Sequence, residues 1–346
     1  NNPLDVISNI NNQLNEIMLN SVEDNDKTPE EVVADYKEFM KERLTKKTEI
    51  IPSPYPSVDK YTIGWLPGQL ITIAARTSVG KTVFATNAAV AAAAAGKSVQ
   101  IFSLEMGEYD LIDRMTSYMS HIPLKTIKTE PFDMNQAKLF ENTLKTYEQY
   151  KINIDPNPRV TVDYSRSKAI KRAQSEDGLD LIIVDYLQLI TNPNHTGNRQ
   201  ESVAEVSREM KILAKQLGVP VIILAQVNRL KSDDDENKMP TINDIRESAA
   251  IAQDSDVIIL IHRNTKSDDV DPKAKFIIGK NRNGEAPKIV TVRAMLECNT
   301  FMDMGGTEDI DGGNDSNNPD DTFVPDDSDE QFFSHTENND QVEESF

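Results

Sequence analysis

The sequence predicts an α/β fold whose central, mostly parallel β-sheet has helices on both faces. Short apolar runs recur from Leu70 onward and alternate with segments of helical spacing, as in sheets built from crossover connections. A loop containing glycine and lysine, residues 75–82, joins one such run to a helix, and an aspartate ends a later run at position 185. Because ligands bind beyond the carboxyl ends of parallel strands, we expect the functional residues there.

The chain has 346 residues and a net charge of −20, but the acidic residues are unevenly distributed. Residues 301–346 hold 15 Asp or Glu and no Lys or Arg. This segment has too few apolar residues to offset the entropy of ordering, so we expect an acidic, disordered tail. The remaining charge, about −5 for residues 1–300, does not exclude nucleic-acid binding.

Cellular location is indicated mainly by what the sequence lacks. No apolar run approaches the roughly 18 residues of a membrane span, and the only cysteine is Cys298. We therefore expect a soluble, cytoplasmic protein with no membrane partner, in a bacterial cell or a phage-infected host.

Residues 1–48 are predicted to form a helical linker or docking arm. Apolar residues recur at helical spacing over 4–20, and a second helix is expected to begin with Thr28 as its N-cap and Pro29 at its first position, running to about Lys47. The sequence begins with Asn rather than Met, so we expect a fragment or a processed product.

Residues 49–300 are predicted to form the α/β domain. A hairpin is expected around Asn283-Gly284, a strong turn signal between two alternating runs at 275–278 and 288–292. The apolar runs predicted as parallel strands are 70–75, 99–104, 181–184, 219–225 and 257–262.

The segment ARTSVGKT matches the phosphate-binding loop, with alanine in place of its first glycine. An apolar strand before it and a helix after it, ended by Gly96, are the context that such a loop requires. Lys81 is expected to reach the β- and γ-phosphates of ATP, and the Thr82 hydroxyl to ligate Mg²⁺. The residues expected to bind nucleotide are Ala75, Arg76, Thr77, Ser78, Val79, Gly80, Lys81, Thr82 and Asp185.

Three further polar residues end apolar runs and are expected at the same sheet edge. Asp185 is placed to hold Mg²⁺ or its water shell. Glu105, on a strand beside the phosphate-loop strand or one removed, is a candidate to polarise the attacking water, its alternative being a solvated acid at a helix start. Gln226 is a candidate sensor of the γ-phosphate. Arg282 lies at the hairpin tip after Lys280, where a solvated turn arginine is an even alternative.

These segments, in this order, resemble the motifs of the DnaB family of replicative helicases. The resemblance covers residues 28–300 and implies a RecA-like ATPase core in a homo-hexameric ring, with single-stranded DNA in the channel and ATP between subunits. It implies Glu105 as general base, Asp185 as the Mg²⁺ acid and Gln226 as phosphate sensor, with Arg282 and Lys280 completing a neighbour's site. The matching segments are 75–82, 103–106, 181–189, 225–229, 244–248 and 280–284.

DNA contacts are expected from three loops that follow strands, residues 192–199, 229–239 and 246–249. A few cations per subunit, repeated around a ring, hold phosphates without sequence preference. Solvated connections are the alternative interpretation. The candidate DNA-binding residues are Arg199, Arg229, Arg246, Glu247 and Ala249.

Two departures from the family accompany the resemblance. We expect the family's usual N-terminal helical domain to be absent before the linker, although primase and a helicase loader remain suggested partners. Alanine stands at positions 75 and 249, where the family usually has glycine. A DnaB-like switch or assembly protein without unwinding activity, and a strand-exchange recombinase with the same core, are the competing interpretations; the presence of Glu105, Gln226 and Arg282 favours hydrolysis.

Overall fold

The computed structural model describes residues 27–45, 50–185, 199–227, 238–245, 248–264 and 272–308. Within them, nine strands form one sheet in the order β3-β2-β4-β5-β1-β6-β7-β8-β9. Neighbours from β3 to β6 are parallel, whereas β7, β8 and β9 continue the sheet in antiparallel fashion. The strands are β1 (Leu70–Ala75), β2 (Val99–Ser103), β3 (Ile152–Asp155), β4 (Leu181–Asp185), β5 (Val221–Gln226), β6 (Val257–His262), β7 (Lys273–Asn281), β8 (Lys288–Met295) and β9 (Thr300–Glu308).

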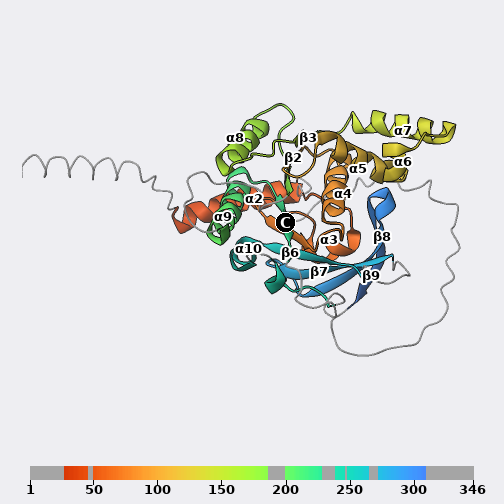
Figure 1. Cartoon of the computed structure of the whole chain (residues 1–346). Coiled ribbons are helices and arrows are strands. Elements are labelled where there is room, and N and C mark those ends of the chain that lie inside the picture. The colour runs from red at the N-terminus through yellow and green to blue at the C-terminus, as the bar shows by residue number, and fades with distance from the viewer. Residues whose placement is uncertain are drawn as a thin grey trace, which may run out of the picture. The chain divides into compact units, whose positions relative to one another are not determined.

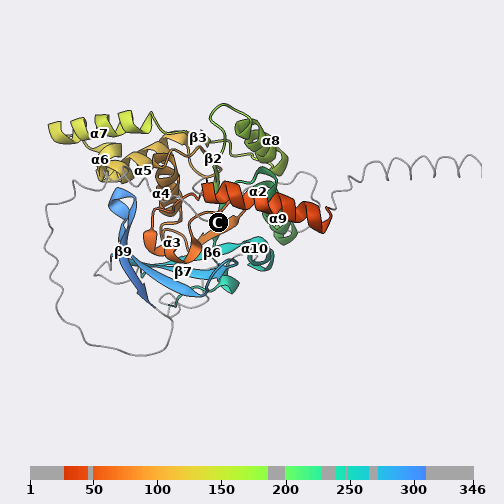
Figure 2. The same ribbon diagram turned by 180° about the vertical axis from the view of Figure 1, so that it is seen from behind.

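Helices connect the parallel strands (Figure 1). In Figure 1, α8, α9 and α10 lie on the left and α4 to α7 on the right, above the antiparallel strands. Seen from behind in Figure 2, α5, α6 and α7 gather at one end of the view and α8 lies at the other. The helices are α2 (Pro29–Thr45), α3 (Pro56–Thr62), α4 (Lys81–Ala94), α5 (Glu108–Ser120), α6 (Leu124–Thr129), α7 (Met134–Tyr147), α8 (Val162–Ala173), α9 (Arg199–Leu217) and α10 (Ser248–Asp254), with the 3₁₀ turns η3 (Ile242–Asp244) and η4 (Leu296–Cys298).

Alternate residues of the strands enter two separate hydrophobic cores, because successive side chains of a strand point to opposite faces. Ile71 and Ile73 of β1 pack with side chains of α4 and α5 on one face. Leu70 and Ala74 pack with side chains of α8, α9 and α10 on the other. Both faces are thus covered, which explains why the parallel strands are continuously apolar in sequence.

The predicted fold class is confirmed, and the five predicted parallel strands and the hairpin are present. β5 begins at Val221 rather than at residue 219, because Pro220 has no N–H to donate to a strand partner. The second predicted helix begins as expected: Thr28 Oγ1 accepts from Glu31 N at 3.4 Å, and the Glu31 carboxylate accepts from Thr28 N at 2.8 Å. The predicted helix over residues 4–20 lies outside the described residues.

Two strands were not predicted, and one of them corrects the start of the acidic tail. β9 runs from Thr300 to Glu308, so residues 301–308 belong to the folded sheet. Phe301 is buried, and the Asp303 carboxylate accepts hydrogen bonds from Ser57 N at 2.6 Å and Ser57 Oγ at 2.7 Å. Averaging the composition over the whole acidic segment hid this short strand. The other strand, β3, has only four residues at the edge of the sheet.

The expected position of Glu105 in the sheet was also wrong. β2, which precedes Glu105, is separated from β1 by both β4 and β5. The connection through α4 leads from β1 to β2 without pairing the two strands. β4 and β5, which come later in the chain, lie between them. Among the described residues, no helix combines the length and apolarity that a membrane span requires.

Candidate nucleotide-binding site

Four strands end at one edge of the sheet and bring their last residues together. Ala75 and Gln226 are direct partners in the pairing of β1 with β5, and Ser103 and Asp185 are partners in the pairing of β2 with β4. Glu105 follows β2 by two residues. The parallel register therefore places the phosphate loop, both candidate acids and the candidate sensor at a single edge.

The phosphate loop turns through two residues with left-handed backbone angles. Ser78 has φ +64° and Gly80 has φ +120°, whereas Ala75 is still in the extended conformation of β1. Alanine is therefore accommodated at position 75, because glycine's freedom is required later in the loop. Gly80 is followed directly by α4, whose N-terminal N–H groups and dipole favour an anion.

Thr82 and Asp185 meet across the site. Thr82 Oγ1 donates a hydrogen bond to Asp185 Oδ2 at 3.2 Å. Asp185 Oδ1 is buried and has no hydrogen-bond partner among the described residues. Burial raises the pKa of the Asp185 carboxyl, although Lys81 opposes that shift. An orphaned carboxylate oxygen beside a hydroxyl fits Mg²⁺, a hard cation that takes oxygen ligands and few protein side chains.

Lys81 is held in a partly dehydrated position. Burial lowers the pKa of its ammonium group, whereas the charges of Asp185 and Glu105 raise it. The negative phosphates of a bound nucleotide would favour the charged form of Lys81 and so oppose the effect of burial.

A cavity of about 370 Å³ collects most of the predicted nucleotide-binding residues, together with both Glu105 and Gln226. Two of the predicted nucleotide-binding residues, Val79 and Asp185, are buried and do not line the cavity. Arg114, Val83 and Leu296 are lining residues that the sequence analysis missed. The remaining lining residues are Ala75, Arg76, Thr77, Ser78, Gly80, Lys81, Thr82, Glu105 and Gln226.

Arg114 connects the cavity to the C-terminal part of the domain. Its guanidinium donates to Asn299 Oδ1 at 3.3 Å, and its buried Nε has no partner among the described residues. Asn299 in turn donates from Nδ2 to Thr86 Oγ1 at 2.8 Å, on α4. A signal for Arg114 exists in the sequence, because it shares a face of α5 with the buried Leu111, three residues earlier.

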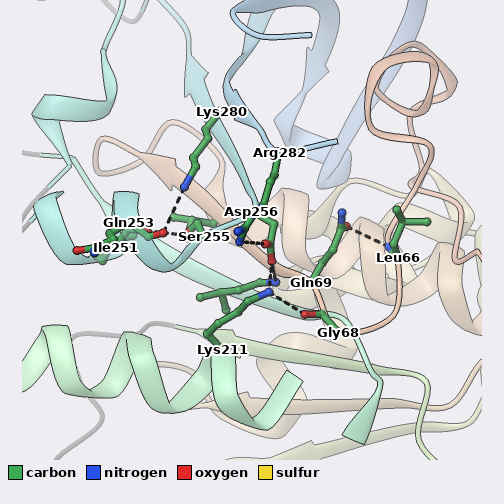
Figure 3. Close-up of polar contacts among 12 residues, drawn as sticks. Leu66, Gly68, Gln69, Lys211, Ile251, Gln253, Ser255, Asp256, Lys280 and Arg282 are labelled. Atoms are coloured by element: carbon green, nitrogen blue, oxygen red, sulfur yellow. Dashed lines mark hydrogen bonds and ion pairs between the residues drawn. The ribbon is translucent and has the colours of Figure 1, made fainter. Parts of the chain in front are cut away.

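The two hairpin cations do not reach this cavity within the chain. Arg282 bonds to Asp256, the residue before β6, and Leu70 N at the start of β1 donates to the same carboxylate at 2.8 Å. Lys280 Nζ donates to the backbone oxygens of Ala252 at 2.6 Å and Gln253 at 3.3 Å, near the end of α10. Both cations therefore lie toward the amino ends of β1 and β6 (Figure 3).

The predicted DNA-binding residues are only partly described. Arg229, Arg246 and Glu247 lie outside the described residues. Arg199 is the first residue of α9, and Ala249 is exposed in the first turn of α10.

The sheet, loop and cavity define a P-loop nucleotide-binding protein of the α/β class. A model of the DnaB-like helicase C-terminal domain matches residues 51–303. The chain belongs to this family.

Curated relatives and solved structures agree with that assignment. Replicative DNA helicase DnaB of Leifsonia xyli is 36% identical over 258 residues, covering 73% of this chain and 56% of the relative. DnaB of Buchnera aphidicola (strain Sg) is 39% identical over 239 residues, covering 68% of this chain and 51% of the relative. The chain thus spans about half the length of these curated relatives.

Two solved structures share the fold, which is RecA-like as predicted. One, described as an ATPase domain, has a TM-score of 0.73 at 27% identity, covering 81% of this chain and all of that one. A DnaB-like replicative helicase, described with its interactions with primase, has a TM-score of 0.70 at 27% identity, covering 86% of this chain and 74% of that one.

Proposed function

We propose that this chain is the motor part of a ring-forming replicative DNA helicase. In this proposal it hydrolyses ATP at subunit interfaces, translocates on single-stranded DNA and unwinds duplex. One observation carries the proposal: Lys81, Glu105 and Gln226 line a single cavity, whereas Arg282 lies toward the opposite ends of the same strands.

The polar residues at this edge of the sheet have roles that follow from their placement. Lys81 and the N–H groups of the loop bind the phosphates of ATP, and Thr82 and Asp185 hold Mg²⁺. When bound, Mg²⁺ neutralises the charge that develops on the phosphates. Glu105 accepts a proton from the attacking water, and Gln226, beside Ala75, senses the γ-phosphate.

Arg282 acts on the nucleotide of a neighbouring subunit. β1 is six residues long, so its ends lie about 17 Å apart, farther than an arginine side chain reaches. A second subunit in a homo-hexamer would bring Arg282 to the γ-phosphate, where such a cation is worth about 10³ to 10⁵ in turnover. Lys280 is a further cation near the end of β7, two residues before Arg282.

Relatives supply the substrate and the partners of the proposal. The curated relatives are named replicative DNA helicases, and one structural neighbour is described with primase. We therefore infer single-stranded DNA as the track, primase and a helicase loader as partners, and the cytoplasm of a bacterium or phage-infected cell as the location. The presence of Glu105 and Gln226 at the cavity favours this proposal over a nucleotide switch without unwinding activity, which can dispense with residues for hydrolysis.

The test is strand displacement on forked DNA with ATP and Mg²⁺, run alongside native mass measurement. We expect a hexamer that displaces the strand and a Lys81→Ala variant that assembles but does not. Hexamers that hydrolyse ATP without displacing a strand would reject the helicase proposal and favour the switch.

Subunit mixing tests the shared site. Arg282→Ala and Lys81→Ala rings are each expected to be inactive, whereas mixed rings regain hydrolysis, because some interfaces combine an intact Lys81 with an intact Arg282. Mixed rings that form without regaining activity would reject this arrangement. Normal hydrolysis by Arg282→Ala alone would leave the residue a turn arginine.

DNA binding through the loop at 246–249 has its own test. Arg246→Ala is expected to weaken binding of single-stranded DNA of every sequence and to flatten its salt dependence, because the contact is to phosphate. Arg159→Ala, which removes an exposed cation elsewhere, is the matched control. Equal affinities of the two variants would place the loop outside the channel.

A further inference from the structure

Asp256 is a buried acid that holds two cations far from the cavity. One carboxylate oxygen, Oδ1, is 3.4 Å from a guanidinium nitrogen of Arg282. The other, Oδ2, bonds to Lys211 Nζ from α9 and accepts from Leu70 N at 2.8 Å. Figure 3 shows Lys211 and Arg282 approaching Asp256 from different elements.

The backbone of Asp256 is fixed to β1. Asp256 N donates to Leu70 O at 2.8 Å, which complements the bond from Leu70 N to the carboxylate. The preceding residue, Ser255, is hydrogen-bonded through Oγ to Thr72 Oγ1 at 2.7 Å. Because β1 is a central strand of the sheet, this anchor has little freedom to move.

Arg282 is attached to that anchor twice but remains accessible. Its backbone N donates to Asp256 O at 2.9 Å, and its guanidinium makes the ion pair with Oδ1. The Arg282 side chain is nevertheless 66% exposed. The backbone hydrogen bond fixes the position of the Arg282 main chain, and the ion pair fixes the direction of its side chain. Most of the side-chain surface remains exposed to solvent.

Lys211 balances the charge of the anchor. It donates to Gly68 O at 2.9 Å as well as to Asp256, and its side chain is largely buried. With two cations around one carboxylate, the group keeps a net positive charge. Asp256 can therefore hold Arg282 without neutralising it.

We propose that Asp256 is a positioning residue for Arg282, orienting its guanidinium toward the nucleotide of the neighbouring subunit. Lys211 occupies the second carboxylate oxygen and so leaves Oδ1 to the arginine. This inference rests on the proposed function, in which Arg282 acts on a neighbour's ATP. Preorganised placement matters here, because a misplacement of about 1 Å can lower turnover about 10²-fold.

The first test is Asp256→Asn, which removes the charge but keeps an oxygen to accept from Leu70 N. We expect DNA-stimulated turnover of ATP to fall about 10²-fold while the KM for ATP stays within about twofold. Asp155→Asn is the matched control, because Asp155 is also buried and bonds to a lysine, Lys168, and to a backbone N–H, that of Asn157. That variant is expected to keep its turnover.

Two readouts separate positioning from a general loss of structure. Adding Asp256→Asn to Arg282→Ala is expected to lower turnover no further, since both changes remove one function. Rings mixed from Asp256→Asn and Lys81→Ala subunits are expected to regain hydrolysis, because the Asp256→Asn subunit still binds and hydrolyses its own ATP. An additive loss in the double variant, or no recovery in mixed rings, would overturn the inference.

Lys211→Met tests the same arrangement if Asp256→Asn does not fold. Without the lysine, the ion pair with Arg282 is the one that Asp256 keeps among the described residues, so the carboxylate draws the guanidinium inward and turnover is expected to fall at unchanged KM. Normal turnover of Lys211→Met would then overturn the inference. If Arg282→Ala is inactive but Asp256→Asn is fully active, the positioning role of Asp256 is rejected and the shared site stands. If Arg282→Ala is fully active, the proposed shared site itself is rejected.

Discussion

The ring of Phe301 lies directly against Gly80 of the phosphate loop. A Cβ placed on Gly80 would be 2.5 Å from Phe301 Cζ and 2.9 Å from Cε2. β9, which carries Phe301, thus packs against the loop that is proposed to bind phosphate. The nucleotide site therefore depends on a strand more than 200 residues further along the chain.

Gly80→Ala is expected to destabilise the domain and to abolish nucleotide binding. Gly96→Ala is the matched control, because Gly96 also has a positive φ, +77°, but a Cβ there meets nothing within 4 Å. The steric contact with Phe301 should make Gly80→Ala about 1 to 3 kcal/mol more destabilising than the control. Urea unfolding of both variants measures this difference, and equal losses of stability would contradict the close packing.

Two truncations are expected to behave in opposite ways. A chain ending after Glu308 keeps every described contact of β9 and should retain its thermal stability and ATPase activity. A chain ending after Thr300 loses Phe301 and the hydrogen bonds that Ser57 donates to the Asp303 carboxylate, so it should unfold at a much lower temperature. Equal melting temperatures would show that β9 contributes nothing to the fold.

Lys81→Ala and Glu105→Gln are expected to separate nucleotide binding from hydrolysis. In the proposed function, Lys81 supplies charge to the bound phosphates, whereas Glu105 acts only on water. Glu105→Gln should therefore bind ATP with nearly unchanged affinity, turn it over slowly and retain DNA, while Lys81→Ala loses affinity for ATP. Equal loss of ATP binding in both variants, measured by calorimetry, would reject Glu105 as the base.

Asp59 makes the stability of the domain dependent on pH. Burial raises the pKa of its carboxyl to about 6 from the ordinary value of 3.8, against the hydrogen bonds from Ser53. The folded state thus favours the protonated acid, and this stabilisation is complete below about pH 4 and lost as pH rises through about 6.

Asp59→Asn, which does not titrate, should gain stability over the wild type by up to about 3 kcal/mol between pH 4 and pH 7. Asp163→Asn, a change at an exposed acid, is the control. Parallel stability curves for the wild type and Asp59→Asn would contradict this expectation.

The sequence predicted the edge of the sheet better than the order of its strands. Buried parallel strands are continuously apolar, so their ends, and with them Asp185 and Gln226, are visible without a structure. The pairing of strands depends on distant contacts that no local pattern encodes. The separation of β2 from β1 by two strands was missed for that reason, although the side chain of Glu105 still lines the cavity.

The residues that could not be predicted from the sequence are placed by contacts between segments that lie far apart in the chain. Arg114 is one cation on an otherwise ordinary amphipathic helix, and its place at the cavity depends on Asn299. β9 was hidden because its acidic residues resemble those that follow. The contacts of Phe301 with Gly80 and of Asp303 with Ser57 are made with partners far away in the chain.

β1 carries the phosphate loop at one end and the anchor of Arg282 at the other. In the proposed ring, this one strand therefore connects two nucleotide sites rigidly. One site is the subunit's own, and the other is the neighbour's site to which Arg282 contributes. A tilt of the subunit that closes one interface must displace the arginine at the next.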